Sequence, residues 1–153
     1  MDQRPPEARP VLVLVATGLG LFMIFLDATI VNVALPDIQN EFDTGEQGLQ
    51  WVVAAYSLTM GMFMMSAATL SDARGRRLAY MGVASIGGGV APSLLVLNIS
   101  RGLQGAGAAI VNVASLALVG AAFTDPAAKA KAIGSWTGIA AVGLAIGPTV
   151  GGV

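Results

Sequence analysis

Two ionisable side chains, Asp27 and Arg101, stand inside stretches of this chain that carry no other charge. If these stretches cross a bilayer, each charge costs about 2.5–3.5 kcal/mol at a helix centre, so such residues usually face an interior and find a partner. A carboxylic acid can also take up a proton, and an adjacent cation favours its charged form. The pattern predicts that the two residues meet, with Asp27 as the proton acceptor and Arg101 tuning its protonation. A purely structural ion pair is the alternative.

The composition indicates which solvent surrounds these residues. Of the 153 residues, 55% are hydrophobic and only 11% are charged, against about 25% charged in a typical soluble domain. A membrane helix needs about 20 apolar residues. Five stretches reach that length, the first interrupted only by Asp27: 10–36, 47–71, 78–100, 102–124 and 132–153. The predicted fold is therefore an all-α, polytopic membrane bundle of about five transmembrane helices.

Two other interpretations of the apolar stretches fit less well. A water-soluble helical bundle would need polar faces on its helices, and these stretches are apolar all round. A cleaved signal peptide would explain Arg4 and Arg9 before the first stretch, but that stretch is long and no A-x-A-like site follows it. We therefore expect the first stretch to remain as a membrane span.

The charges between the stretches alternate in sign along the chain. Segment 36–48 carries four acidic residues and no basic one. Seven of the eight basic residues fall on the other side of the predicted spans: Arg4, Arg9, Arg74, Arg76, Arg77, Lys129 and Lys131. Because cytoplasmic loops collect Lys and Arg, we predict a multi-pass cell-membrane protein with a cytoplasmic N-terminal tail at 1–10 and a transmembrane helical domain at 11–153.

Several function classes have no support in the sequence. The chain has no Cys and no His, which removes thiol chemistry and the commonest general base and metal ligand. We find no metal-ligand cluster, no nucleophile with a base and no phosphate-binding loop, so we expect no enzyme, no cofactor and no metal site. A basic stripe suited to nucleic acid is also missing. The expected partner is membrane lipid.

A charged cluster between the second and third stretches, LSDARGRRL at 70–78, has a specific order of residues. It resembles the loop signature between helices 2 and 3 of the major facilitator superfamily, G-x-L-a-D-r-x-G-r-[rk]. Ala68 stands where the family has its first glycine. The matching residues are Leu70, Asp72, Gly75, Arg76 and Arg77.

Three more segments follow in the family's order. LDATIVNVALP at 26–36 resembles the helix 1 signature of drug:proton antiporters, especially the branch with fourteen helices. RGLQGAGAA at 101–109 is similar to the helix 4 signature, and GLAIGPTVGG at 143–152 to the helix 5 antiporter signature. The resemblance covers residues from about 11 to 153.

This resemblance implies roles for the charged residues. It links the helix 4 arginine, here Arg101, to proton coupling, in line with the role predicted for Asp27. It also implies that the cytoplasmic cluster forms a gating latch that opens during transport, although a merely solvated topogenic loop is the alternative. Asp125, which we expect to lie at the same face and to pair with Arg76, belongs to this predicted group with Asp72, Gly75 and Arg77.

Uncharged residues within the spans form a second predicted group. Glycines spaced four apart let membrane helices approach closely, and proline can kink a helix. The resemblance implies that segment 143–152 takes part in antiport, while close packing without any transport role is the alternative. The residues expected to line a substrate path or pack helices are Asn32, Gln104, Gly143, Gly147, Pro148 and Gly151.

The stretch 78–100 must hold the third span, a turn and the start of the fourth span. A turn at Ala91–Pro92–Ser93 leaves a short third span, whereas a turn at Asn98–Ile99–Ser100 moves Arg101 to the outer interface. The resemblance favours the first turn.

The expected function is that of the N-terminal portion of a proton-coupled multidrug efflux antiporter. Its partners would be protons and a small hydrophobic substrate, once further helices complete the path. Because the family's path lies between two six-helix halves, we expect the chain to be a fragment that does not transport alone. A small membrane interaction or assembly subunit and an inert truncated remnant are the alternatives.

Overall fold

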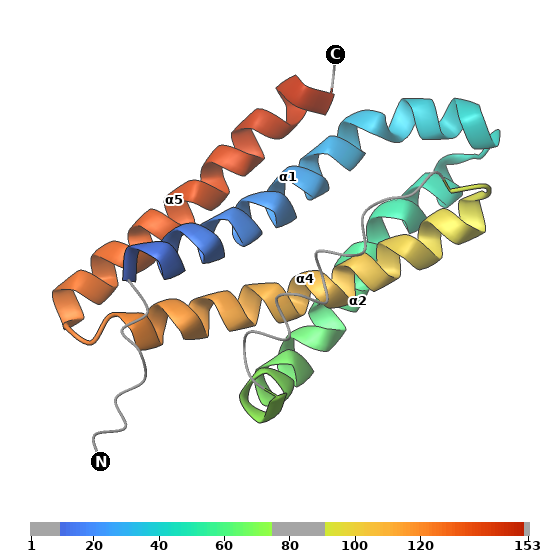
Figure 1. Cartoon of the computed structure of the whole chain (residues 1–153). Helices are drawn as coiled ribbons and strands as arrows, with labels where there is room; N and C mark the ends of the chain where they lie inside the picture. Colours follow the sequence, from blue (N-terminus) through green and yellow to red (C-terminus); the bar gives the residue numbers. More distant parts are fainter. Residues whose placement is uncertain (1–9, 75–90, 152–153) are drawn as a thin grey trace.

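A computed structural model describes residues 10–74 and 91–151, with side chains described outside 68–74. Within these ranges the chain is helical and contains no strand (Figure 1): α1 (Pro10–Phe42), α2 (Glu46–Arg74), α4 (Leu94–Ala122) and α5 (Pro126–Gly151). All four are long and apolar enough to cross a membrane, α2 over Glu46–Ala67. The all-α membrane prediction is confirmed. Most of the predicted third span lies outside the described residues.

The surface of the bundle is apolar where a water-soluble protein would be polar. Val11, Met62 and Met65 are 70%, 73% and 87% exposed. Helices that face water carry polar residues on their outer side. These exposed side chains are therefore suited to contact with lipid.

The first span is longer than the apolar stretch that predicted it. We expected a connection over 36–48, but α1 continues through Pro36 to Phe42 and α2 already begins at Glu46. Asp43 adopts a left-handed backbone with φ 44°, and the Thr44 N–H bonds to the Gln39 carbonyl at 3.2 Å. This six-to-one bond closes the helix end in the manner of a Schellman motif. The apolar stretch thus ends at residue 36, six residues before α1 ends at Phe42.

The turn before α4 lies at the first of the two predicted positions. Ser93 caps α4, and its Oγ accepts a bond from the Val96 N–H at 3.4 Å. Asn98–Ile99–Ser100 therefore lie within the helix. Arg101 is consequently placed about two turns inside α4, as the resemblance favoured.

The helices pack mainly as two pairs. α2 packs along α4 and α1 packs along α5, while α4 also contacts α1. One apolar core unites α1, α4 and α5, and its buried members are Leu21, Val119, Ala132, Trp136 and Ala140. The start of α1 and the α4–α5 turn lie at one end of the bundle, and the α1–α2 turn and the start of α4 lie at the other (Figure 1). This alternation agrees with successive membrane crossings.

Candidate functional site

The two ionisable residues predicted to meet do form an ion pair. Nη1 of Arg101 on α4 lies 2.7 Å from Oδ2 of Asp27 on α1. The two side chains differ in exposure, at 5% for Arg101 and 35% for Asp27. The arginine is therefore enclosed by protein, while the carboxylate is partly exposed.

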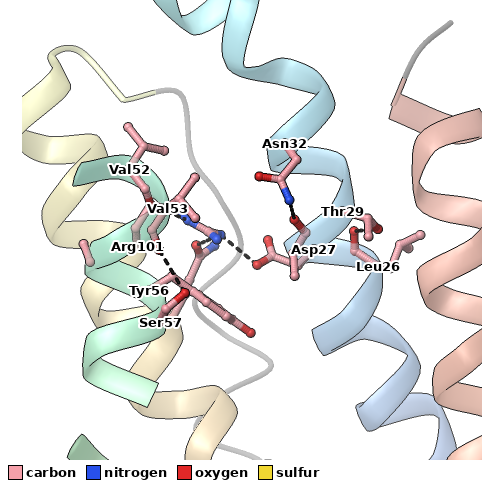
Figure 2. A network of polar contacts seen from close by, with 12 residues as sticks. Leu26, Asp27, Thr29, Asn32, Val52, Val53, Tyr56, Ser57 and Arg101 are labelled. Atoms are coloured by element: carbon pink, nitrogen blue, oxygen red, sulfur yellow. Dashed lines mark hydrogen bonds and ion pairs between the residues drawn. The ribbon is translucent and has the colours of Figure 1, made fainter. Parts of the chain in front are cut away.

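Three further groups surround the guanidinium of Arg101. Its Nη1 also donates to Oε1 of Gln104 at 2.9 Å, and its Nε makes a long bond of 3.5 Å to the Val52 carbonyl. Its Cζ lies 4.4 Å from the centre of the Tyr56 ring. Figure 2 shows Arg101 reaching across α2 toward Asp27 on α1. Three helices thus converge on one cation.

The close approach of α2 and α4 makes this reach possible. Gly105 lies one helical turn beyond Arg101, and a Cβ there would overlap the Tyr56 carbonyl oxygen and the Thr59 hydroxyl. Gly105 is itself buried. The missing side chain brings the α2 backbone within reach of the Arg101 side chain, which explains the bond to Val52.

Sequence reasoning did not identify Val52, Tyr56 or Gly105 as part of the site. Val52 contributes a backbone carbonyl, for which any residue type would serve. Tyr56 is one aromatic residue in an apolar stretch, and Gly105 is one of the glycines of the 101–109 segment, where it was not singled out. The spacing from Gly105 to Arg101 was the available signal, since residues four apart share a helix face.

The polar residues predicted to line a path or pack helices behave differently from each other. Gln104 is half-buried and accepts a bond from Arg101, so it belongs to the ion-pair site. Asn32 is exposed, and its Nδ2 donates to the Ala28 carbonyl of its own helix at 3.0 Å. The described contacts of Asn32 therefore link no second helix.

Three of the predicted α5 glycines pack on α1. A Cβ on Gly143 would lie 2.7 Å from the Phe22 carbonyl oxygen, one on Gly147 would overlap the Thr29 side chain, and one on Gly151 would lie 3.4 Å from the Ile30 Cα. Gly134 and Gly138 share the spacing but have no atom within 4 Å of such a Cβ. The C-terminal half of α5 thus carries the close contact. Pro148 is exposed on the same segment.

The predicted cytoplasmic cluster is described only in part. Asp72 lies in the last turn of α2, without a described side chain, and Gly75, Arg76 and Arg77 fall outside the described residues. Asp125 caps α5, since its Oδ2 accepts a bond from the Ala128 N–H at 2.8 Å. The predicted pairing of Asp125 with Arg76 stays a prediction.

The described ranges hold no group of three His, Cys, Asp or Glu side chains that could bind a metal ion. The distinctive feature of these ranges is the ion pair between Asp27 and Arg101. Protonation of the partly exposed carboxylate would remove the anionic partner of the buried cation. The Arg101 charge persists, because guanidinium groups do not lose their proton in proteins. The ion pair therefore links α1 to the α2–α4 pair.

Comparisons with known proteins place this geometry in context. The sequence-family model described as Major Facilitator Superfamily matches residues 17–153 of this chain. The chain is 63% identical over 148 residues to the multidrug resistance protein Stp of Mycobacterium tuberculosis, covering 93% of this chain and 28% of Stp. It is 49% identical to the drug efflux pump JefA of the same organism, over 93% of this chain and 29% of JefA. The puromycin resistance protein pur8 of Streptomyces alboniger is 36% identical over 86% of this chain and 27% of pur8.

Proposed function

This chain belongs to the Major Facilitator Superfamily, and from that premise we propose that it forms the N-terminal part of a proton-coupled exporter of small hydrophobic compounds. Its relatives carry the names multidrug resistance protein and drug efflux pump, and the chain spans about 28% of their length. Further helices would supply the rest of the path. The single observation that carries the proton coupling is the buried Arg101 against a partly exposed Asp27.

In this proposal Asp27 exchanges a proton with the space that its side chain borders. While Asp27 is charged, its bond to Arg101 holds α1 against α4. An adjacent cation favours the carboxylate, and withdrawal of that cation favours protonation. Protonation and the movement of α1 relative to the α2–α4 pair are thus coupled, and the coupling lets a proton gradient drive a change in shape.

The test needs a complete transporter, and a chimera in which this chain replaces the matching segment of Stp provides one. In inverted vesicles, export of a fluorescent drug by the chimera should depend on an imposed pH gradient. The substitution Asp27→Asn should reduce that dependence at least tenfold, because the amide cannot take up the proton. Glu41→Gln, which removes an exposed carboxylate from the same helix, should leave it unchanged.

Two results would contradict the proposal. Unchanged proton dependence in Asp27→Asn would remove Asp27 from the mechanism. A chain that co-purifies with a larger membrane protein, while the chimera exports nothing, would favour an assembly subunit instead.

We further propose that the N-terminus and the α4–α5 turn face the cytoplasm. The chain has no cysteine, so a single introduced cysteine can be labelled without background from other sites in the chain. Gly45→Cys lies in the α1–α2 turn, where a Cβ meets nothing within 4 Å, and Thr124→Cys lies exposed before α5. A membrane-impermeant maleimide applied to intact cells should label Gly45→Cys, while Thr124→Cys should react only after lysis. The reverse pattern would invert the topology.

A further inference from the structure

The buried guanidinium of Arg101 needs stabilisation that the ion pair with Asp27 does not provide when Asp27 is protonated. Asp27 is the one charged group among its described partners, and in the proposed cycle Asp27 is neutral for part of the time. Arg101 is 4% exposed and keeps its charge throughout. A buried cation without compensation is strongly disfavoured. The guanidinium must therefore have a second attraction that does not depend on the proton.

The contacts of Arg101 identify that attraction. The Val52 carbonyl, Gln104 and the Tyr56 ring all belong to the α2–α4 pair, whereas Asp27 belongs to α1. The Tyr56 ring presents its face to the guanidinium at 4.4 Å. A cation within about 6 Å of an aromatic centroid is attracted by the ring quadrupole, and more strongly where both groups are desolvated. Tyr56 is only 7% exposed.

The hydroxyl of Tyr56 does not account for the position of the ring. Its oxygen is buried and has no hydrogen-bond partner among the described residues, although buried tyrosine hydroxyls usually have one. The close approach of α2 to Gly105 places the Tyr56 backbone beside α4, since a Cβ at Gly105 would overlap the Tyr56 carbonyl oxygen. The contact that this arrangement provides is the ring face against Arg101.

We propose that Tyr56 is a positioning residue that holds Arg101 on the α2–α4 pair when Asp27 is neutral. The inference rests on the proton-coupled function proposed above. The described ionisable groups in contact with Arg101 are Asp27 and Tyr56. The lysines of α5, Lys129 and Lys131, lie in the first two turns of that helix. With Arg101 kept in place, its positive charge favours release of the proton from Asp27 when α1 packs against α4 again.

The test observes Arg101 directly and needs no transport. The chain is labelled with ¹⁵N-arginine in lipid nanodiscs, and Arg101→Lys identifies the Arg101 signal by its loss. Asp27→Asn mimics the neutral acid. In that background the Arg101 side-chain N–H signals should stay shifted upfield by the ring and remain slow to rotate. Tyr56→Phe should preserve this signature, because it keeps the ring and removes only the hydroxyl.

The substitution Tyr56→Leu in the same background should abolish both the upfield shift and the slow rotation. Tyr56→Met, which fills the space without a ring, is the second variant if the leucine variant loses helix content by circular dichroism. Slow rotation that survives both variants would overturn the proposal. Loss of the signature in Tyr56→Phe would also overturn it, because the hydroxyl would then be the anchor. These outcomes hold whether or not the chimera exports a drug.

Discussion

Replacing Asp27 with leucine should destabilise the bundle, by less than the roughly 3–5 kcal/mol that removal of one partner typically costs in a fully buried ion pair, because the Asp27 side chain is 35% exposed. The substitution leaves Arg101, at 4% exposure, without its anion. Arg101→Leu should cost less, because the Asp27 side chain that remains is 35% exposed and is therefore not enclosed without a partner.

The double variant measures the interaction energy between the Asp27 and Arg101 side chains. Asp27→Leu with Arg101→Leu should cost less than the sum of the single variants by about 0.5–3 kcal/mol, the range for residues in direct contact. Unfolding by SDS in mixed micelles, followed by circular dichroism, measures all three. Glu41→Leu is the control on the same helix, where the carboxylate is exposed. Equal losses for Asp27→Leu and Glu41→Leu, or strict additivity, would mean that the pair contributes nothing to stability.

Adding a single methyl group at Gly105 should also have a large effect. The Cβ of Gly105→Ala would overlap the Tyr56 carbonyl oxygen, and a backbone atom cannot rotate out of the way. Overpacking of this kind costs about 1–3 kcal/mol. Because α2 must then move away from α4, the bond from Arg101 to the Val52 carbonyl should be lost as well. SDS unfolding measures the first effect, and the Arg101 signal in ¹⁵N spectra measures the second.

Gly138→Ala provides the matched control for Gly105→Ala. It makes the same change in a helix, but the added Cβ meets nothing within 4 Å. Alanine is favoured over glycine in helix interiors by about 0.8–1.0 kcal/mol, so this variant should be as stable as the parent or more so. If the two alanine variants unfold alike, the close contact between α2 and α4 is absent.

Much of the fold was predictable because lipid imposes a simple rule on sequence. A span must be long and apolar, so the uncharged stretches identified α2, α4 and α5 as membrane helices. The end of α1 was predicted wrongly, at residue 36 instead of Phe42, because the apolar stretch ends where exposure to water begins while the helical hydrogen bonds continue.

The sequence by itself determined that Asp27 and Arg101 would need partners, since an ionisable residue in an apolar membrane stretch is costly without one. Only the tertiary structure decided what surrounds them. Glycines at the same spacing in α5 divide into Gly143 and Gly147, which pack on α1, and Gly134 and Gly138, which do not. In a membrane helix the lipid-facing and helix-facing sides are both apolar, so periodicity carries little information about which face is packed. The partnership of Tyr56, Gly105 and Arg101 therefore depends on how α2 docks against α4.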